Sequence, residues 1–178
     1  PFTDVETDIW YRSAVEFAYT NKLFSGVSAT EFGPNVTMNR AMLATVLHKM
    51  AGNPEADTAA TAFGDVGSGR YYSDAVKWAV SKGLVSGYSD GNFGPSDPIT
   101  RQQLAFILWN YSGKPEAEKV LTNSDADNIS NYAKEAMQWA VETGVMSGRA
   151  NGQLDPKGNA TRAEVAQMLK NYIEKVVM

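Results

Sequence analysis

The stretch Leu84-Val85-Ser86-Gly87 recurs in altered form as Leu23-Phe24-Ser25-Gly26 and as Val145-Met146-Ser147-Gly148 in this chain of 178 residues. The three glycines are 61 residues apart at each step. The same offset relates further sets of residues: Phe32, Phe93 and Leu154; Pro34, Pro95 and Pro156; Arg40, Arg101 and Arg162. A fixed period of this length is typical of a repeated structural unit. We therefore predict repeats at 1–61, 62–122 and 123–178, joined in one cooperative module.

The first half of each repeat has the pattern of a short helix. Ala75, Val76 and Ala79 of the second repeat form an apolar stripe with helical spacing, and similar residues stand 61 positions before and after them. We expect this helix to end at Gly83 and at its counterpart Gly144, because glycine suits the left-handed position that follows a helix. The first repeat has Asn21-Lys22 there, and Asn is the next best residue.

The second half of each repeat predicts a longer helix. It begins after a good N-cap residue, which is Asn39, Thr100 or Thr161. Gln103 and Glu164 stand three residues after the two threonines and complete capping boxes. Apolar side chains then follow at i, i+3, i+4 and i+7: Leu43, Val46, Leu47 and Met50; Leu104, Ile107, Leu108 and Tyr111; Val165, Met168, Leu169 and Tyr172.

These patterns predict an all-α fold of three helix-loop-helix repeats. One pair of helices cannot bury such a stripe alone, so we expect the three second helices to pack on one another. The resulting prediction is a pseudo-three-fold arrangement around a central three-helix bundle. The alternative is an open solenoid.

Composition excludes several functions. The net charge is −4 and there is no run of basic residues, which argues against binding to nucleic acid. The absence of cysteine removes thiolate chemistry and cysteine-ligated zinc. No apolar run approaches the roughly 18 residues of a membrane-spanning helix. Since residue 1 is proline, we expect a processed or excised piece of a longer protein, from which a signal peptide has been lost.

The chain resembles three tandem S-layer homology (SLH) repeats, and the resemblance covers nearly all of it. The matching motifs are Phe63-Gly64-Asp65-Val66 at a repeat start, the loop from Ser86 to Pro95, and Ile99-Thr100-Arg101-Gln102-Gln103 at the second helix. The first and third repeats depart from the pattern: the first lacks Asp-Gly in its loop, and the third begins Ser124-Asp125-Ala126-Asp127. The second repeat is the most typical.

The resemblance implies a non-catalytic module without cofactor or metal. Such modules anchor secreted surface proteins to the bacterial cell wall, and their grooves between repeats bind secondary cell-wall polysaccharide, often one that bears a pyruvate ketal. We expect this chain to be part of a larger surface protein at the cell wall, without insertion in a membrane. Two alternatives are binding of modified peptidoglycan and contact with other subunits in a surface lattice.

The repeated arginines have a physical argument of their own. Arg40, Arg101 and Arg162 each follow an N-cap, where the helix dipole disfavours a cation by roughly 0.3 to 1 kcal/mol. Backbone N–H groups at such a place attract anions, and a guanidinium matches a carboxylate. We therefore predict a carboxylate site and expect Arg101→Ala to weaken binding while leaving the fold nearly intact. The alternative is that each arginine braces the neighbouring repeat through Asp4, Asp65 or Asp127.

Other candidate ligand contacts accompany the arginines. Asp90 precedes Gly91 in a sequence typical of a tight turn. As a secondary role, we predict that Asp90 contacts a sugar hydroxyl. Trp78 and Trp139 are candidate stacking platforms, although aromatic residues at helical spacing are usually core residues. The full set of predicted polysaccharide-binding residues is Arg40, Arg101, Arg162, Asn39, Thr100, Thr161, Gly26, Gly87, Gly148, Asp90, Trp78 and Trp139.

Overall fold

The computed structural model describes residues 2–56 and 63–177, which contain six α-helices and no β-strand. The helices are α1 Arg12–Thr20, α2 Arg40–Met50, α3 Ser73–Ser81, α4 Arg101–Tyr111, α5 Lys134–Glu142 and α6 Arg162–Tyr172. Two 3-10 turns precede α5, η1 Ala126–Asn128 and η2 Asn131–Ala133, and the π-helical turn η3 Ile173–Val177 extends α6. The prediction of an all-α fold is confirmed.

The helix boundaries follow from local sequence. The side chain of Asn39 accepts a hydrogen bond from the amide of Met42, and Thr100 and Thr161 both take part in complete capping boxes, as predicted. The first helices of the second and third repeats are followed by left-handed Gly83 and Gly144, also as predicted. In the first repeat, however, the left-handed residue is Lys22, with a φ of 58°, and not Asn21.

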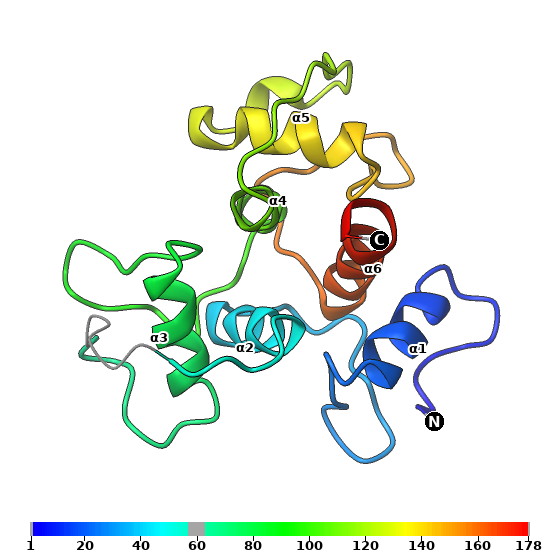
Figure 1. Cartoon of the computed structure of the whole chain (residues 1–178). Helices are drawn as coiled ribbons and strands as arrows, with labels where there is room; N and C mark the ends of the chain where they lie inside the picture. The colour runs from blue at the N-terminus through cyan, green and yellow to red at the C-terminus, as the bar shows by residue number, and fades with distance from the viewer. Residues whose placement is uncertain (1, 57–62, 178) are drawn as a thin grey trace.

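Each second helix packs against the first helix of the next repeat. The main helix pairs are α2 with α3, α4 with α5, and α6 with α1. Figure 1 shows α2, α4 and α6 around the middle of the molecule and α1, α3 and α5 outside them. The pair of α6 with α1 brings the two ends of the chain together, which excludes the open solenoid. The sequence did not predict this pairing across the repeat boundaries.

A ring of three backbone hydrogen bonds joins the segments that lead into the second helices. The amide of Met38 donates to the carbonyl of Ala160, that of Ala160 to Ile99, and that of Ile99 to Met38, each at 2.9 Å. One residue comes from each repeat, so the ring closes only when all three are present. The pseudo-three-fold symmetry itself stays a prediction.

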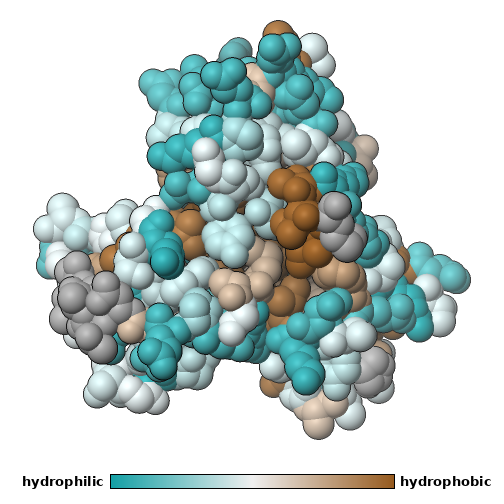
Figure 2. All heavy atoms as spheres, viewed as in Figure 1, coloured by the Kyte–Doolittle hydropathy of each residue, from teal (hydrophilic) through white to brown (hydrophobic). Residues whose placement is uncertain are grey.

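The apolar stripes of the second helices are mostly buried, as their spacing predicted, although Met50 and Tyr111 at the ends of two stripes are only partly buried. In α4, for example, Leu104 and Leu108 are fully buried and Ile107 is nearly so. The fully buried rings of Phe32 and Phe93 extend the core beneath the loops. On the face in Figure 2, hydrophilic residues dominate the periphery and hydrophobic residues gather nearer the middle. The core is thus shared among the repeats.

One carboxylate fixes the opening segment of each repeat to its loop. Asp4 accepts hydrogen bonds from the amides of Phe32 and Gly33, at 2.8 and 2.7 Å. Asp65 makes the equivalent bonds to the second loop and Asp125 those to the third. The sequence predicted no such role; it offered Asp4, Asp65 and Asp127 only as partners of the arginines. In the third repeat the aspartate that holds the loop is Asp125, one residue before the position that a spacing of 61 gives.

Candidate functional site

The three repeated arginines are buried and hold the loop of the next repeat. Their relative exposures are 9%, 4% and 7% for Arg40, Arg101 and Arg162. Each donates from Nε and Nη2 to two backbone carbonyls of that loop, at 2.6 to 2.9 Å. The acceptors are Phe93 and Ser86 for Arg40, Leu154 and Ser147 for Arg101, and Phe32 and Ser25 for Arg162. The arginines therefore brace the neighbouring repeat, but through carbonyls and not through the aspartates that we expected.

The amides at the start of each second helix are also occupied. In α2 the amide of Arg40 donates to the carbonyl of Asp97 at 2.9 Å and that of Ala41 to Pro95 at 3.0 Å. The amide of Met42 donates to the Asn39 side chain at 2.8 Å. The same bonds recur in α4 and α6, where Thr100 and Thr161 are the caps. The expectation of free amides for an anion is thus wrong, and the three capping side chains serve their own helices.

The guanidinium of Arg40 is largely buried and lies over the rings of Phe93 and Tyr88. Its Cζ is 4.4 Å from the centroid of Phe93 and 5.0 Å from that of Tyr88. Burial lowers the pKa of Arg40, and the nearby Tyr88, Asp97 and Asp65 offset part of that effect. Arginine nevertheless stays protonated in proteins. A buried cation of this kind gains from an anionic partner.

The three arginines differ at the remaining nitrogen, Nη1. That of Arg101 donates to Glu164 Oε1 at 3.0 Å, and Arg149 Nη1 reaches the same oxygen at 3.1 Å. For Arg40 and Arg162, no partner of Nη1 lies within hydrogen-bonding distance among residues 2–56 and 63–177. Two of the three arginines therefore retain a donor.

Two grooves open beside these arginines. The first, which we call the Arg40 groove, has a volume of about 580 Å³, and its lining includes Arg40, Ser86, Gly87, Tyr88 and Gln103. The second, the Arg101 groove, has a volume of about 400 Å³, and its lining includes Arg101, Ser147, Gly148, Arg149 and Glu164. These residues correspond one to one at a spacing of 61. Each groove is formed between one repeat and the next.

An exposed aromatic residue of the remaining repeat lines the Arg101 groove, and another packs on a residue that lines the Arg40 groove. Trp10, from the first repeat, lines the Arg101 groove and is 60% exposed. Its counterpart in the third repeat, Tyr132, is 50% exposed and packs edge-on against Phe106, which lines the Arg40 groove. Tyr71 is the third member of the set, at the same spacing of 61. Sequence reasoning missed these residues, although their spacing was a signal that could have found them.

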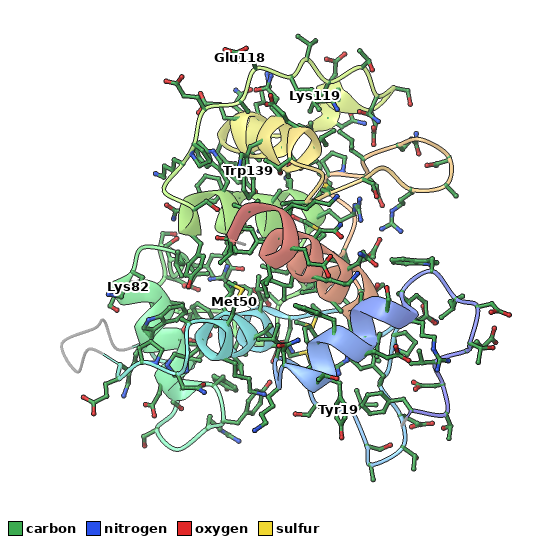
Figure 3. The ribbon with its side chains drawn as sticks, turned by 45° about the vertical axis from the view of Figure 1, so that its right-hand side comes forward. Tyr19, Met50, Lys82, Glu118, Lys119 and Trp139 are labelled. Atoms are coloured by element: carbon green, nitrogen blue, oxygen red, sulfur yellow. The ribbon has the colours of Figure 1, made fainter. Side chains whose placement is uncertain are left out.

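The predicted stacking residues Trp78 and Trp139 lie in the core. Each is 3% exposed, and neither lines the Arg40 or the Arg101 groove. The ring of Trp139 packs 6.3 Å from that of Tyr172, and Figure 3 shows it on the inner side of α5. A sugar cannot stack on an indole that is covered in this way. The stacking prediction for these two residues is therefore wrong, and the aromatic residues that are exposed at a common spacing of 61 are Trp10, Tyr71 and Tyr132.

The predicted glycines and Asp90 shape the loops. Gly87 and Gly148 line the two grooves. A Cβ at Gly87 would collide with the Phe63 ring and lie 2.9 Å from the carbonyl of Asn92, and one at Gly26 would be similarly crowded. Asp90 accepts two hydrogen bonds from Asn92 at 3.0 Å, which stabilise the turn at the loop tip. These residues therefore have structural roles, and a ligand contact of Asp90 stays a prediction.

Two further properties concern the described part of the chain alone. Within it, no set of three or more histidine, aspartate and glutamate side chains is arranged to bind a metal ion. None of its helices has both the length and the hydropathy required to cross a bilayer.

Comparison with known proteins identifies the repeat. The S-layer homology domain family model matches residues 1–42, 62–105 and 124–166. The chain is 32% identical over 182 residues to an amylopullulanase of Thermoanaerobacterium thermosulfurigenes, covering 98% of this chain and 10% of that protein. It is 29% identical over 180 residues to exoglucanase XynX of Acetivibrio thermocellus, covering 98% of this chain and 16% of that protein.

An S-layer protein of Bacillus licheniformis is 31% identical over 144 residues, which cover 79% of this chain and 16% of that protein. The chain thus spans between a tenth and a sixth of the length of these relatives. The repeats, the helix order and the family match agree with one another, and the chain belongs to the S-layer homology domain family.

Proposed function

We propose that this chain is a non-catalytic module that anchors a larger surface protein to the bacterial cell wall by binding an anionic secondary cell-wall polysaccharide. Membership of the S-layer homology family indicates a place at the cell surface. Relatives named as S-layer proteins and as enzymes of polysaccharide breakdown share the repeats, which cover only a small part of each. The activity of such larger proteins would then lie in other domains.

The observation that carries this proposal is the Arg40 groove. The buried guanidinium of Arg40 lines this groove, and its Nη1 has no hydrogen-bond partner among residues 2–56 and 63–177. Exposed Tyr132 packs on Phe106, which also lines the groove. Its volume of about 580 Å³ lies within the roughly 300 to 1,000 Å³ that is usual for small-ligand sites. A guanidinium bonds a carboxylate, and an aromatic ring packs on a sugar face. The groove therefore suits an acidic sugar.

The ligand that fits this chemistry is a saccharide with a carboxylate, such as a terminal sugar bearing a pyruvate ketal. A hydrogen bond to a charged group contributes about 1.5 to 3 kcal/mol. A neutral sugar would leave the Arg40 donor without an anionic partner. The single histidine, His48, lies outside both grooves with its Nε2 2.7 Å from the carbonyl of Pro54, so neither groove has an imidazole for acid-base catalysis.

Binding to cell walls tests this proposal. Walls purified from a Gram-positive bacterium that carries S-layer homology proteins are divided in two, and one half is treated with acid to remove the secondary polysaccharide. The chain should sediment with untreated walls and remain in solution with treated walls. Equal sedimentation with both would indicate binding to modified peptidoglycan. Sedimentation with neither, together with self-association of the chain, would indicate an assembly domain.

A further inference from the structure

We infer that Asn151, at the tip of the third loop, is a site of spontaneous deamidation, in which the amide of Gly152 is the nucleophile and water is the second reactant. The side-chain amide becomes a carboxylate, and the formal net charge of the chain changes from −4 to −5. This inference concerns a covalent modification of the chain, and it does not depend on the proposed function.

The residue that follows Asn151 favours this reaction. In deamidation, the backbone nitrogen of the next residue attacks the carbonyl carbon of the asparagine side chain. A side chain on that next residue crowds the attack and restricts the backbone, whereas glycine has none. Asn151 is the only asparagine of the chain that precedes a glycine.

The loop tip exposes and polarises the reacting groups. Asn151, Gly152 and Gln153 are all exposed, so water and base reach them from solution. The amide of Gln153 donates to Asn151 Oδ1 at 3.0 Å, which makes the side-chain carbonyl carbon more electrophilic. The Gly152 amide donates to the carbonyl of Arg149 at 2.8 Å, and this bond must open before the attack. Exposed backbone hydrogen bonds in loops open readily.

The reaction balances in two steps. In the first, a base in solution removes the proton of the Gly152 amide, whose nitrogen bonds to Cγ of Asn151, and Nδ2 takes up a proton and leaves as ammonia. The product is a cyclic succinimide. In the second, water adds to one of the two ring carbonyls and opens the ring. Opening at Cγ gives aspartate, and opening at the backbone carbonyl gives isoaspartate, in which the chain continues through the side chain.

The second repeat shows that the turn accommodates the aspartate product. Asp90 stands 61 residues before Asn151, and each of the two residues is followed by a glycine. Asp90 accepts from the amide and from the side-chain nitrogen of Asn92, both at 3.0 Å. These two bonds lower the pKa of Asp90. An aspartate at position 151 can accept from Gln153 in the same way once the Gln153 side chain turns its nitrogen inward.

The isoaspartate product alters the same turn. It adds one carbon atom to the backbone just before Gly152. The turn is held by a bond from the Gly152 amide to the carbonyl of Arg149 and by one from the Arg149 amide to the carbonyl of Gln153, each at 2.8 Å. The lengthened chain changes the spacing of these donors and acceptors. We therefore expect isoaspartate to loosen the loop at Arg149, whose side chain pairs with Glu164.

Incubation of the whole chain in mildly alkaline buffer tests this inference. Samples taken over time are digested with trypsin, and tandem mass spectrometry follows the replacement of an amide by a carboxylate. Cleavage after Arg149 and Lys157 gives a peptide in which Asn151 is the only asparagine. Asn35 is the matched control, because it is also exposed and the amide of Val36 donates to a carbonyl three residues back. Deamidation at Asn151 should be at least about tenfold faster than at Asn35, since valine is branched and glycine has no side chain.

Two variants complete the test. Asn151→Gln should remove the mass gain, because its longer side chain would have to close a larger and less favourable ring. An isoaspartyl methyltransferase should label the aged wild-type chain and not the aged Asn151→Gln chain. Asn151→Asp should melt with the wild-type chain, and a clear loss of stability would contradict the shared turn. The inference is wrong if Asn151 keeps its amide as long as Asn35 does, or if Asn151→Gln gains mass or label as fast as the wild-type chain.

Discussion

The amide of Met38 in the first repeat donates a hydrogen bond to the carbonyl of Ala160 in the third, at 2.9 Å. Ile99 of the second repeat completes the ring. Each of these residues therefore depends on both of the other repeats for its backbone hydrogen bonds. Buried backbone groups that lose their partners are costly, so the ring couples the folding of the three repeats.

A single repeat should not fold alone. Residues 62–122 contain α3 and α4, but the main helical partners of these helices are α2 and α5 in the adjacent repeats. The isolated segment would expose the apolar stripe that includes Leu104 and Leu108. We expect a broad, non-cooperative melt by circular dichroism, in contrast to the whole chain. A sharp transition in the isolated segment would contradict the shared core.

Arg101→Ala should destabilise the chain, contrary to what the sequence suggested. It leaves the carbonyls of Leu154 and Ser147 without their donor and removes one partner of buried Glu164. Breaking a buried ion pair on one side costs about 3 to 5 kcal/mol. The matched control is Arg149→Ala, since Arg149 is 38% exposed and such pairs contribute about 0 to 1 kcal/mol. Urea unfolding compares the two, and equal losses would show that Arg101 is no brace.

Gly87→Ala should destabilise the second loop. The new methyl group would meet the ring of Phe63 and lie 2.9 Å from the carbonyl of Asn92, so the loop must move. Overpacking of this kind costs about 1 to 3 kcal/mol. Gly67→Ala is the control, because a Cβ there has no described atom within 4 Å. Thermal melts should separate the two variants, and the reverse order would contradict the crowding.

Tyr132→Ala should weaken binding of a carboxylated probe, a methyl glucopyranoside with a pyruvate ketal on O4 and O6, and change stability little. The ring is half exposed and packs on Phe106 at the Arg40 groove. Loss of an aromatic platform in a sugar site should reduce affinity about fivefold or more, since aromatic contacts contribute about 0.5 to 1.5 kcal/mol beyond buried area. Trp10→Ala, at the Arg101 groove, is the matched control and should leave affinity unchanged by calorimetry. A larger effect at Trp10 would assign the probe to the other groove.

The negative charge should provide most of the affinity. The methyl ester of the probe keeps the shape of the sugar but has no charge for Arg40 to bind. We expect the acid to bind about a hundredfold more tightly, which corresponds to about 2.7 kcal/mol. Added salt should weaken the acid only moderately, because burial shields the guanidinium from screening. Equal affinities by titration would assign recognition to the aromatic residues.

The sequence predicted the features that depend on residues close together in the chain, namely the helix starts and the buried helix faces. Helix starts at Thr100 and Thr161 followed from capping boxes, and the buried stripes followed from helical spacing. Contacts between repeats could not be read in this way. The carbonyl partners of Arg101 are 46 and 53 residues away. Every residue has a backbone carbonyl, so the sequence does not show which one an arginine will contact.

The spacing of 61 also had limits as a guide. It identified equivalent positions, but it cannot tell exposed from buried aromatic residues, so Trp78 was predicted to meet the ligand and Trp10 was overlooked. It also fails at the start of the third repeat, where the residue 61 positions after Asp65 is Ala126, whereas Asp125 holds the loop. Burial and register are properties of the assembled repeats.

The ring of Met38, Ile99 and Ala160 has a consequence for how such modules change in evolution. A chain that lost one unit would leave two unmatched edges, and a chain that gained one would have an extra unit with no place in the closed circle. Duplication or deletion of a single unit should therefore destabilise the module as long as the circle is kept. The number of copies is set by geometry, and the residues that line each groove are left to diverge, as Gln103 and Glu164 have done.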